Sequence, residues 1–292
     1  MTTEVVKIGV IGGSGLYNMP EITNKTTISI DTPFGKPSGD IVVGTLNGKR
    51  VAFLSRHGEG HIYTPTTVPY RANIYAMKTL GVRFIISANA CGSLREDYEP
   101  GHMVIPDQVY DNTKDRERTF FDTGMVAHIS VADPFCPELN DILYEAVQQT
   151  NASVHLGGNF VIVEGPRFST RGESNIFRQW GCSIIGMTTC PEAFLAREAE
   201  IAYSTIAHIT DYDVWHKEPV TVDMVMKTMQ HNVIIVQQSI ANAVKTLDEN
   251  AVYEAHNTLD NAMATGAGKI TFEMKDKLLP IVERYFADQI NG

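Results

Sequence analysis

The sequence lacks the features that mark several large classes of protein. No apolar run approaches the roughly 20 residues that a membrane-spanning helix needs. The first residues, MTTEVVKIGVIGG, do not combine a basic stretch with an apolar core, as a secretory signal peptide does. Basic side chains are in deficit, because 24 Lys and Arg face 34 Asp and Glu, for a formal net charge of -10. We therefore expect no nucleic-acid or membrane partner, since both require a basic face.

Cysteine is also scarce, and no two cysteines form a CxxC pair. A zinc ribbon or a thioredoxin-type redox site therefore has no support in the sequence. The four cysteines are Cys91, Cys136, Cys182 and Cys190. In a long chain without a signal peptide, free thiols in a reducing compartment are expected. The sequence thus predicts a cytoplasmic protein.

Short apolar runs alternate with amphipathic stretches along the 292 residues, of which 43% are hydrophobic and 20% charged. Strands are predicted at residues 5–11, 41–46, 50–55, 83–87, 103–109, 160–163, 183–187 and 203–209. Helices are predicted at residues 68–80, 138–149, 175–180, 192–199, 221–247 and 273–286. This alternation predicts an α/β fold whose mostly parallel central sheet is flanked by helices on both faces.

No linker, repeat or low-complexity tract divides the chain, so residues 1–292 are expected to form one domain. Asn47-Gly48 predicts a hairpin turn between two of the strands. A less regular, partly helical C-terminal extension begins at about residue 248. Within it, ATGAGK is faintly similar to a phosphate loop, but Met263 and Ile270 stand where that pattern needs Gly and Ser or Thr. We interpret this stretch as an ordinary loop.

A glycine-rich segment, Gly12-Gly13-Ser14-Gly15, follows the first strand. Glycines let backbone N–H groups approach an anion, and a serine hydroxyl adds a donor. A phosphate cradle and a tight strand-to-helix turn explain this sequence equally well. A dinucleotide fingerprint is a rival, but Asn18 occupies its last glycine position.

Possible anion donors follow three further strands, and in open α/β sheets ligands gather at the carboxyl ends of strands. Arg56 and His57 offer a planar fork and a ring donor, which together suit an oxyanion. Asn89 and Thr188 each offer another donor, and small residues around Asn89 permit close backbone contact. Ordinary explanations remain open, because Arg and His are common in surface loops and Thr caps helices. Cys91 has no basic partner nearby and is interpreted as a buried, inert thiol.

Two carboxylates follow a strand in the segment Thr210-Asp211-Tyr212-Asp213. Side chains two positions apart on an extended chain point the same way, so the carboxylates lie close together. Proximity raises the pKa of one of them, and a protonated Asp can donate a hydrogen bond. Such a pair suits a purine, which leaves when N7 is protonated and whose exocyclic amino group needs an acceptor. Taken alone, however, the segment favours a helix N-cap or a divalent metal site.

Together these segments resemble the trimeric purine nucleoside phosphorylase family, and within it the 5′-methylthioadenosine phosphorylases. The resemblance rests on GVIGGSGLY, DTPFGKPSG, FLSRHGEGH, ANACGSLRE, ADPFCPEL, VEGPRFSTRGE, GMTTCPEAFLAREAEIAY and TDYDVW. These segments run in the family's order over about residues 5 to 245. The resemblance implies one α/β domain with a mixed, distorted central sheet. It also implies a homotrimer, or a higher assembly of trimers, with active sites near subunit interfaces.

The resemblance also implies roles for individual residues. Phosphate falls to six residues: Ser14, Arg56, His57, Asn89, Ala90 and Thr188. The residues implied to bind the base and ribose are Cys91, Gly92, Phe168 and Met187. Of these, Phe168 would stack on the base and Met187 would lie under the ribose. The catalytic pair is Asp211, which engages N7, and Asp213, which helps to bind the amino group. The 5′-methylthio pocket falls to Val222, Met226 and a neighbouring subunit's residue equivalent to His128.

The implied reaction is phosphorolysis of 5′-methylthioadenosine to adenine and 5-methylthioribose 1-phosphate, a step of purine and methionine salvage catalysed by a pentosyltransferase. Phosphate is the co-substrate, and no metal or organic cofactor is implied. Two departures lie near phosphate or sugar, because Asn89 replaces a Thr and Gly186 replaces an Asn that are common in the group. They leave open a broader purine nucleoside or 5′-methylthioinosine phosphorylase. In 6-oxopurine relatives, Asn stands in place of Asp211.

Two other classes of protein are weaker alternatives. A non-catalytic nucleoside-binding module is disfavoured because Arg56, His57 and Asp211 are all present. An NAD(P)-dependent oxidoreductase would rest on the glycine-rich turn alone. The strictness for a 5′-methylthio group, the strictness for a 6-amino base and the role of the tail are not set by the sequence.

Overall fold

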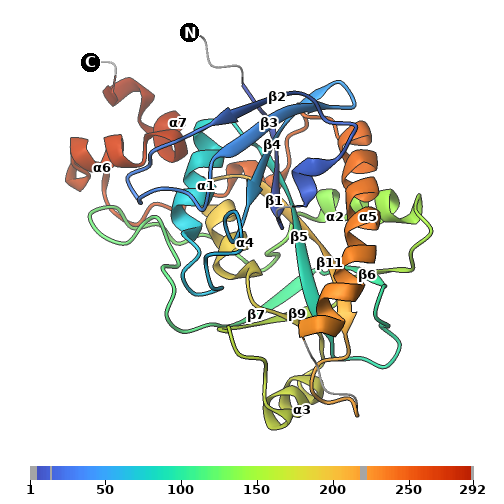
Figure 1. The fold of residues 1–292 in the computed structure, drawn as a ribbon. Helices are drawn as coiled ribbons and strands as arrows, with labels where there is room; N and C mark the ends of the chain where they lie inside the picture. Colours follow the sequence, from blue (N-terminus) through green and yellow to red (C-terminus); the bar gives the residue numbers. More distant parts are fainter. Residues whose placement is uncertain (1–4, 14, 218–221, 291–292) are drawn as a thin grey trace.

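A mixed sheet of eleven strands organises the computed structural model, which describes residues 5–13, 15–217 and 222–290 (Figure 1). The strands run in the order β2-β3-β4-β1-β5-β10-β9-β7, while β11 pairs with β5 and β6, and β8 pairs with β6. Their bounds are β1 Ile8–Gly12, β2 Thr23–Ile28, β3 Ile41–Leu46, β4 Lys49–Ser55, β5 Phe84–Ser93, β6 Met103–Ile105, β7 Gln108–Asn112, β8 Val154–Leu156, β9 Asn159–Val163, β10 Cys182–Gly186 and β11 Ala202–Asp211.

Helices cover both faces of the sheet, as predicted (Figure 1). Their bounds are α1 Tyr70–Thr79, α2 Pro137–Gln148, α3 Arg171–Gln179, α4 Thr189–Glu198, α5 Val222–Thr246, α6 Phe272–Lys277 and α7 Leu279–Ile290, with short 3-10 turns at Leu16–Asn18, Glu254–Asn257 and Ala267–Lys269. One core layer packs α1, α4 and α7 against the sheet, and the other packs α2 and α5. Within β5, Ile85 enters the first layer while Phe84 and Ile86 enter the second. Burial on both faces explains why the central strands are continuous apolar runs.

The sheet is less parallel than the alternation of elements predicts. β5 runs parallel to β1 and β11 but antiparallel to β10, and β11 runs antiparallel to β6. The register of β11 also shifts between Ile209 and Asp211. The expectation of a mostly parallel sheet is therefore only partly met, whereas the mixed, distorted sheet implied by the family resemblance is confirmed.

Strand β5 is longer than predicted. The sequence indicated a strand ending at Ser87 and then a loop, because the residues that follow are small. That interpretation is wrong, since residues 88–92 pair with β11 on one side and the last residues of β5 pair with β10 on the other. Strand β11 likewise continues to Asp211, so the carboxylate pair begins inside the sheet.

Several local predictions are confirmed and others need correction. Asn47 and Gly48 both have positive φ, 50° and 78°, as the predicted hairpin turn requires. The predicted strand 103–109 is two strands, β6 and β7, separated at Pro106, which cannot donate a ladder hydrogen bond. The predicted helix 273–286 is divided into α6 and α7 just before Pro280. The mostly exposed strand β2 and the short, half-buried strand β8 were not predicted.

The sequence predicted free thiols and no membrane-spanning helix. All four cysteines are free and buried. Among the described residues, no helix has the length and apolar character needed to cross a membrane. The tail beyond residue 248 packs against the body of the domain, for example through Lys7, whose Nζ donates to Asn250 Oδ1 at 2.6 Å. The proposed boundary near 248 remains a prediction.

Candidate active site

Chemically useful residues converge where β4, β1, β5 and β11 end. These four strands are neighbours and run parallel, so their carboxyl ends share one edge. Arg56 follows β4, Asn89 lies near the end of β5, and Asp211 ends β11. Thr188 joins them from the start of α4, because its hydroxyl donates to Asn89 Oδ1 at 2.8 Å. Ala90 is the only exposed residue of β5, which marks where solvent reaches the cluster.

The Arg56 guanidinium is buried and held at several points. Its Nε and Nη2 donate to the two carboxylate oxygens of Glu192 at 2.7 and 2.8 Å. Nη1 donates to the Ala88 carbonyl oxygen at 3.0 Å, and Nη2 also donates to Ser87 Oγ at 2.6 Å. Burial opposes the charge, but the ion pair with Glu192 outweighs it and holds the pKa of Arg56 above its usual range. The charge of Arg56 is thus matched locally, and the described residues accept from every N–H of the guanidinium but one on Nη1.

The Asn89 amide is directed at protein atoms. Its Nδ2 donates to Ser87 Oγ at 2.9 Å and to Thr205 Oγ1 at 2.6 Å. Its Oδ1 accepts from Thr188, so the two predicted phosphate residues are brought into direct contact. Both amide N–H groups have protein acceptors in this arrangement, and direct donation from Asn89 to phosphate stays a prediction.

The His57 ring lies next to Arg56 and is fixed on two sides. Its Nδ1 lies 2.9 Å from the Tyr63 carbonyl oxygen, a contact that requires the N–H on Nδ1. The ring stacks on that of His61, with centroids 4.1 Å apart. Burial, followed by the positive charge of Arg56, lowers the pKa of His57 to about 4, although the hydrogen bond to Tyr63 acts against this. His57 is therefore neutral at neutral pH, and Nε2 carries a lone pair.

Asp211 and Asp213 are buried together at the end of β11. The backbone N–H of Asp213 donates to Asp211 Oδ1 at 2.8 Å, and Thr210 Oγ1 donates to Asp211 Oδ2 at 2.7 Å. Burial raises the pKa of both carboxyl groups. Oδ2 of Asp213 is buried and has no hydrogen-bond partner among the described residues. It is the carboxylate oxygen best placed to serve a ligand, because an unpaired buried polar atom is costly.

Gly92 of β5 lets the carboxylate pair lie against the sheet. A Cβ at this position would stand 3.1 Å from Asp211 Oδ1 and 3.2 Å from the Cβ of Asp213. The neighbouring Cys91 is buried, and burial, together with the Asp211 charge, raises the pKa of its thiol well above the usual range. Cys91 therefore has the inert character predicted for it, and with Gly92 it forms the floor beneath the carboxylates.

The sequence analysis left two alternatives for the carboxylate pair, a helix N-cap and a divalent metal site. Neither Asp caps a helix, since β11 ends at Asp211 and α5 begins only at Val222. Within the described parts of the chain, no group of three or more His, Cys, Asp and Glu residues is arranged to hold a metal ion. The role of the pair toward a ligand stays a prediction.

Phe168 and Met187 lie on segments that touch each other. Phe168, with 42% of its side chain exposed, belongs to the loop between β9 and α3. Gly165 of the same loop has a φ of 66°, and a Cβ there would stand 2.6 Å from Met187 Sδ. Just before Met187, a Cβ on Gly186 would stand 2.8 and 2.9 Å from two ring atoms of Phe160. Packing against Phe160 thus accounts for glycine at position 186.

The sequence analysis gave no role to Arg116 or to Glu164 of the VEGPRFSTRGE segment, yet they tie these segments together. Arg116 Nη1 donates to the carbonyl oxygens of Met187 and Cys190 at 2.7 and 2.6 Å. Its Nη2 donates to the Glu164 carbonyl oxygen at 2.7 Å, and its Nε to Glu164 Oε1 at 3.1 Å. Burial opposes the charge of Glu164, but hydrogen bonds from Thr66 and nearby backbone N–H groups lower its pKa to about 2. The partners are distant in sequence, so no local pattern reveals them.

The remaining predicted residues are placed less completely. Ser14 lies outside the described residues, and so does the side chain of Val222, although α5 begins there. Met226 is 46% exposed on the same helix. His128 lies beside the tail, where its backbone N–H donates to the Ala262 carbonyl oxygen at 2.9 Å. A contribution of His128 to a neighbouring subunit's site stays a prediction.

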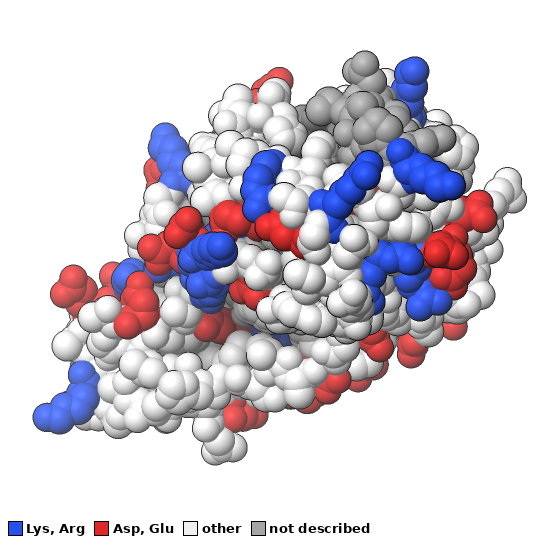
Figure 2. Space-filling model, turned by 90° about the horizontal axis from the view of Figure 1, so that it is seen from below, with Lys and Arg blue, Asp and Glu red and all other residues white. Residues whose placement is uncertain are grey.

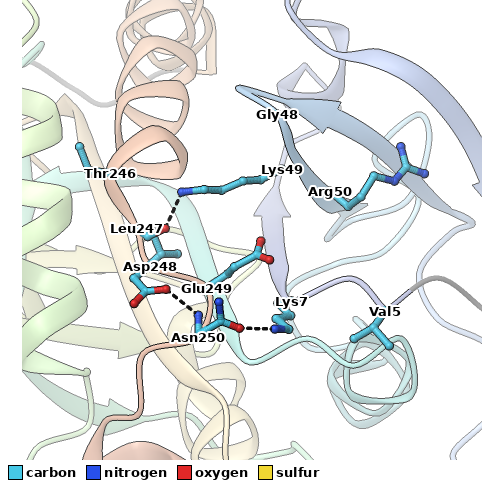
Figure 3. Close-up of a pocket in the computed structure, with 10 residues that line it drawn as sticks. All are labelled: Val5, Lys7, Gly48, Lys49, Arg50, Thr246, Leu247, Asp248, Glu249 and Asn250. Carbon is cyan, nitrogen blue, oxygen red and sulfur yellow. Dashed lines mark hydrogen bonds between the residues drawn. The ribbon is translucent and has the colours of Figure 1, made fainter.

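A separate cavity of about 520 Å³ opens near the start of β1, at the other end of that strand (Figure 3). It is lined by Val5, Lys7, Gly48, Lys49, Arg50, Thr246, Leu247, Asp248, Glu249 and Asn250. Lys49 Nζ donates there to the Val244 and Leu247 carbonyl oxygens at 2.8 and 2.6 Å, and so satisfies the last carbonyls of α5. None of the predicted site residues lines this cavity. Its two lysines, Lys7 and Lys49, donate to protein atoms and so stabilise the fold. We therefore place the site at the carboxyl ends of the strands.

Surface charge fits a small ligand better than a polyanion. Figure 2 shows Lys and Arg interspersed with Asp and Glu on the face seen from below, without one continuous basic area. This distribution agrees with the formal net charge of -10.

Known proteins match this chain over most of its length. Residues 7–245 match the model of the phosphorylase superfamily. The S-methyl-5′-thioadenosine phosphorylase of Chloroflexus aurantiacus is 54% identical over 283 residues, which is 96% of this chain and 98% of that protein. A methylthioadenosine phosphorylase crystal structure from an antarctic soil metagenomic library superposes with a TM-score of 0.92 at 49% identity, covering 95% of this chain and 99% of that one.

A second solved structure is less similar to this chain. It is a variant of the adenosine/methylthioadenosine phosphorylase of Schistosoma mansoni, in complex with methylthioadenosine. Its TM-score is 0.77 at 39% identity, and the match covers 82% of this chain and 90% of that one.

Proposed function

The chain belongs to the phosphorylase superfamily, and on that premise we propose that it cleaves 5′-methylthioadenosine with inorganic phosphate to adenine and 5-methylthioribose 1-phosphate. It is a pentosyltransferase of the phosphorylase type. The names of the similar proteins support the substrate, because they match nearly the whole chain at about half identity.

One structural observation carries the proposal. Strand β5 bears both halves of a phosphorolytic site within six consecutive residues. Ser87 and Asn89 contact the anion donors Arg56 and Thr188, while Gly92 lies against the carboxylate pair. A nucleoside laid across Ala90 would therefore have phosphate donors on its sugar side and carboxylates on its base side.

The proposed reaction uses these two sides in one displacement. A phosphate oxygen forms a bond to C1′ while the bond from C1′ to N9 breaks and its electron pair passes to the purine. A proton from the Asp211–Asp213 pair moves to N7, so adenine leaves neutral and the pair is left ionised. Burial raises the pKa of both carboxyl groups, which favours their protonated forms and supports this role. Phosphate held by Arg56, His57 and Thr188 stabilises the positive charge that develops on the sugar.

A second candidate substrate is adenosine. The Schistosoma mansoni relative is named for both adenosine and methylthioadenosine. In this chain the Asn89 N–H groups donate to Ser87 and Thr205, and the Thr188 hydroxyl donates to Asn89. Thr188 can therefore meet phosphate in this arrangement by accepting from a phosphate O–H. Breadth toward the 5′-hydroxyl remains a second proposal.

A substrate panel tests both proposals. Adenosine, inosine and their 5′-methylthio forms are incubated with and without phosphate, and release of the base is followed. We expect phosphate-dependent release of adenine from 5′-methylthioadenosine with the highest kcat/KM. Faster cleavage of inosine would contradict the assignment. Comparable cleavage of adenosine would establish the broader specificity.

We also propose that the protein acts in the cytoplasm as a homotrimer whose sites include His128 of a neighbouring subunit. Subunits carrying Asp211→Asn and subunits carrying His128→Ala are each expected to be impaired in their own homotrimers. In mixed trimers, about a quarter of the sites would combine an intact Asp211 with an intact neighbouring His128. Recovery of activity on mixing supports the shared site. An absence of recovery in trimers verified by sedimentation would contradict it.

A further inference from the structure

Ser87 and Glu192 lie behind the residues expected to touch phosphate. Both side chains are fully buried, so neither can meet a ligand directly. Ser87 Oγ accepts hydrogen bonds from Arg56 Nη2 at 2.6 Å and from Asn89 Nδ2 at 2.9 Å. It also donates to Glu192 Oε1 at 3.2 Å. One hydroxyl thus joins the charged half of the anion site, Arg56 and Glu192, to its uncharged half, Asn89 and Thr188.

Glu192 sets the orientation of the guanidinium. It accepts from two sides of Arg56 and from Tyr203 Oη, which donates to Glu192 Oε1 at 2.8 Å. A guanidinium has five N–H groups. Nε uses one on Glu192, and Nη2 uses two among Glu192, Ser87 and the Ile11 carbonyl oxygen. Nη1 uses one on Ala88, so a single N–H of Arg56 is without an acceptor among the described residues, and its direction is fixed by the others.

The uncharged half is fixed through the same hydroxyl. Asn89 Nδ2 bridges Ser87 Oγ and Thr205 Oγ1, which holds the amide plane and points Oδ1 at Thr188. Loss of the Ser87 hydroxyl would release one amide N–H of Asn89 and one bond of Arg56 together. Both proposed phosphate contacts would then be free to move.

From this network, we propose that Ser87 and Glu192 are positioning residues that preorganise the phosphate site by locking Arg56 and the Asn89–Thr188 pair in one geometry. The proposal rests on the proposed phosphorolysis. It makes Asn89 the residue that orients Thr188, whose hydroxyl donates to Asn89 Oδ1 and can accept from a phosphate O–H. Preorganised donors bind better because they pay no ordering entropy when phosphate arrives.

Kinetics of Ser87→Ala test the proposal in the full-length enzyme. Ser204→Ala is the matched control, because Ser204 is also fully buried in the sheet but donates to Asn140, next to α2. We expect Ser87→Ala to raise the KM for phosphate about tenfold, the equivalent of one lost hydrogen bond, and to leave the KM for the nucleoside within about twofold. Arsenate in place of phosphate should show the same ratio. Ser204→Ala should change neither KM.

Tyr203→Phe examines the Glu192 arm independently, because it removes one donor to Glu192 and keeps the ring. We expect the KM for phosphate to rise again, by less than in Ser87→Ala. The proposal is overturned if both variants keep the wild-type KM for phosphate. It is also overturned if, within each variant, the KM for phosphate and the KM for the nucleoside rise by the same factor. A wild-type enzyme without phosphate-dependent turnover would instead refute the proposed function, so the two failures are distinguishable.

Discussion

The backbone N–H of Asp213 lies 2.8 Å from Oδ1 of Asp211 and donates a hydrogen bond to it. This contact makes the two carboxyl groups unequal. Both oxygens of Asp211 accept a hydrogen bond from the protein, whereas Oδ2 of Asp213 has no partner among the described residues. The pair can therefore hold a proton and still offer an acceptor, which a 6-aminopurine requires at N7 and at its amino group.

Replacing Asp211 with Asn should separate these functions. The amide cannot transfer a proton to N7, so kcat/KM for 5′-methylthioadenosine should fall by roughly 10²- to 10⁴-fold. The amide can donate to O6, so the ratio of 5′-methylthioinosine to 5′-methylthioadenosine cleavage should rise. The kcat/KM and the substrate ratio are both measured by release of the base, with Asp248→Asn in the exposed tail as the control. An unchanged substrate ratio would mean that Asp211 does not read the base.

The neutral His57 should favour anions that carry an O–H group. Its Nδ1 faces the Tyr63 carbonyl oxygen, so Nε2 can only accept a hydrogen bond at neutral pH. Phosphate and arsenate carry an acidic O–H, but sulfate does not. We expect sulfate to inhibit competitively with a constant roughly 10-fold or more above the KM for phosphate. His57→Ala should shrink this difference. If sulfate bound as well as phosphate, His57 would have to be charged in the complex.

Glu198 should make stability depend on pH. It is a buried carboxyl at the end of α4, and burial raises its pKa to about 7 although Thr119 and Phe120 donate to it. An unfolded Glu titrates near about 4.3, so between these values the folded state keeps a proton that the unfolded state loses. The free energy of unfolding should therefore fall as pH rises from about 4.3 to about 7, by up to about 3 kcal/mol.

Glu198→Gln should flatten this dependence. Denaturant unfolding of both proteins is compared between about pH 5 and pH 8. The difference between them isolates Glu198 from the buried His57 and His208, whose lowered pKa values remove stability as pH falls. Parallel curves for wild type and variant would show that Glu198 is ionised throughout this range.

Arg116→Lys should be far from conservative. The Arg116 side chain is completely buried, and its fork holds the carbonyl oxygens of Met187, Cys190 and Glu164. A lysine keeps the charge but cannot span these acceptors, so we expect a loss of about 3 kcal/mol in the free energy of unfolding. The KM for the nucleoside should rise as well, because Met187 and the loop of Phe168 lose their common support.

Arg95→Lys is the matched control for that experiment. Arg95 also makes two hydrogen bonds to a carboxylate, Asp97, but the pair is exposed. Its loss should change stability by less than about 1 kcal/mol. Equal destabilisation by the two substitutions would contradict the role given to Arg116.

The sequence predicted the fold well where both faces of an element are buried. In a layered α/β domain, a continuous apolar run fits a strand that is covered on both faces, as in β4 and β11. An amphipathic pattern fits a helix on the sheet, as in α2. Prediction failed where small residues form a strand. Residues 88–92 look like a loop by propensity, but pairing on both sides makes them part of β5. Tertiary pairing overrides local propensity at such positions.

The site was predictable in part, for a related reason. Arg56, Thr188 and Asp211 follow predicted strands, and the rule that ligands gather at strand ends places them together. Ser87, Glu192 and Arg116 were missed because their partners lie tens or more than a hundred residues away in the chain. A buried hydrogen-bonding network leaves no spacing pattern in the sequence. The role of Asn89 was harder still, because only its acceptors reveal how its amide is directed.

Gly186 and Phe160 are committed to each other, since a Cβ at position 186 would overlap the Phe160 ring. This contact has a consequence for how the protein can evolve. A side chain at 186 can be accepted only after Phe160 has become smaller, whereas a smaller residue at 160 leaves a cavity until 186 gains volume. Residues 160 and 186 are therefore expected to change together. Relatives with a larger residue beside Met187 are therefore expected to carry a smaller one in β9.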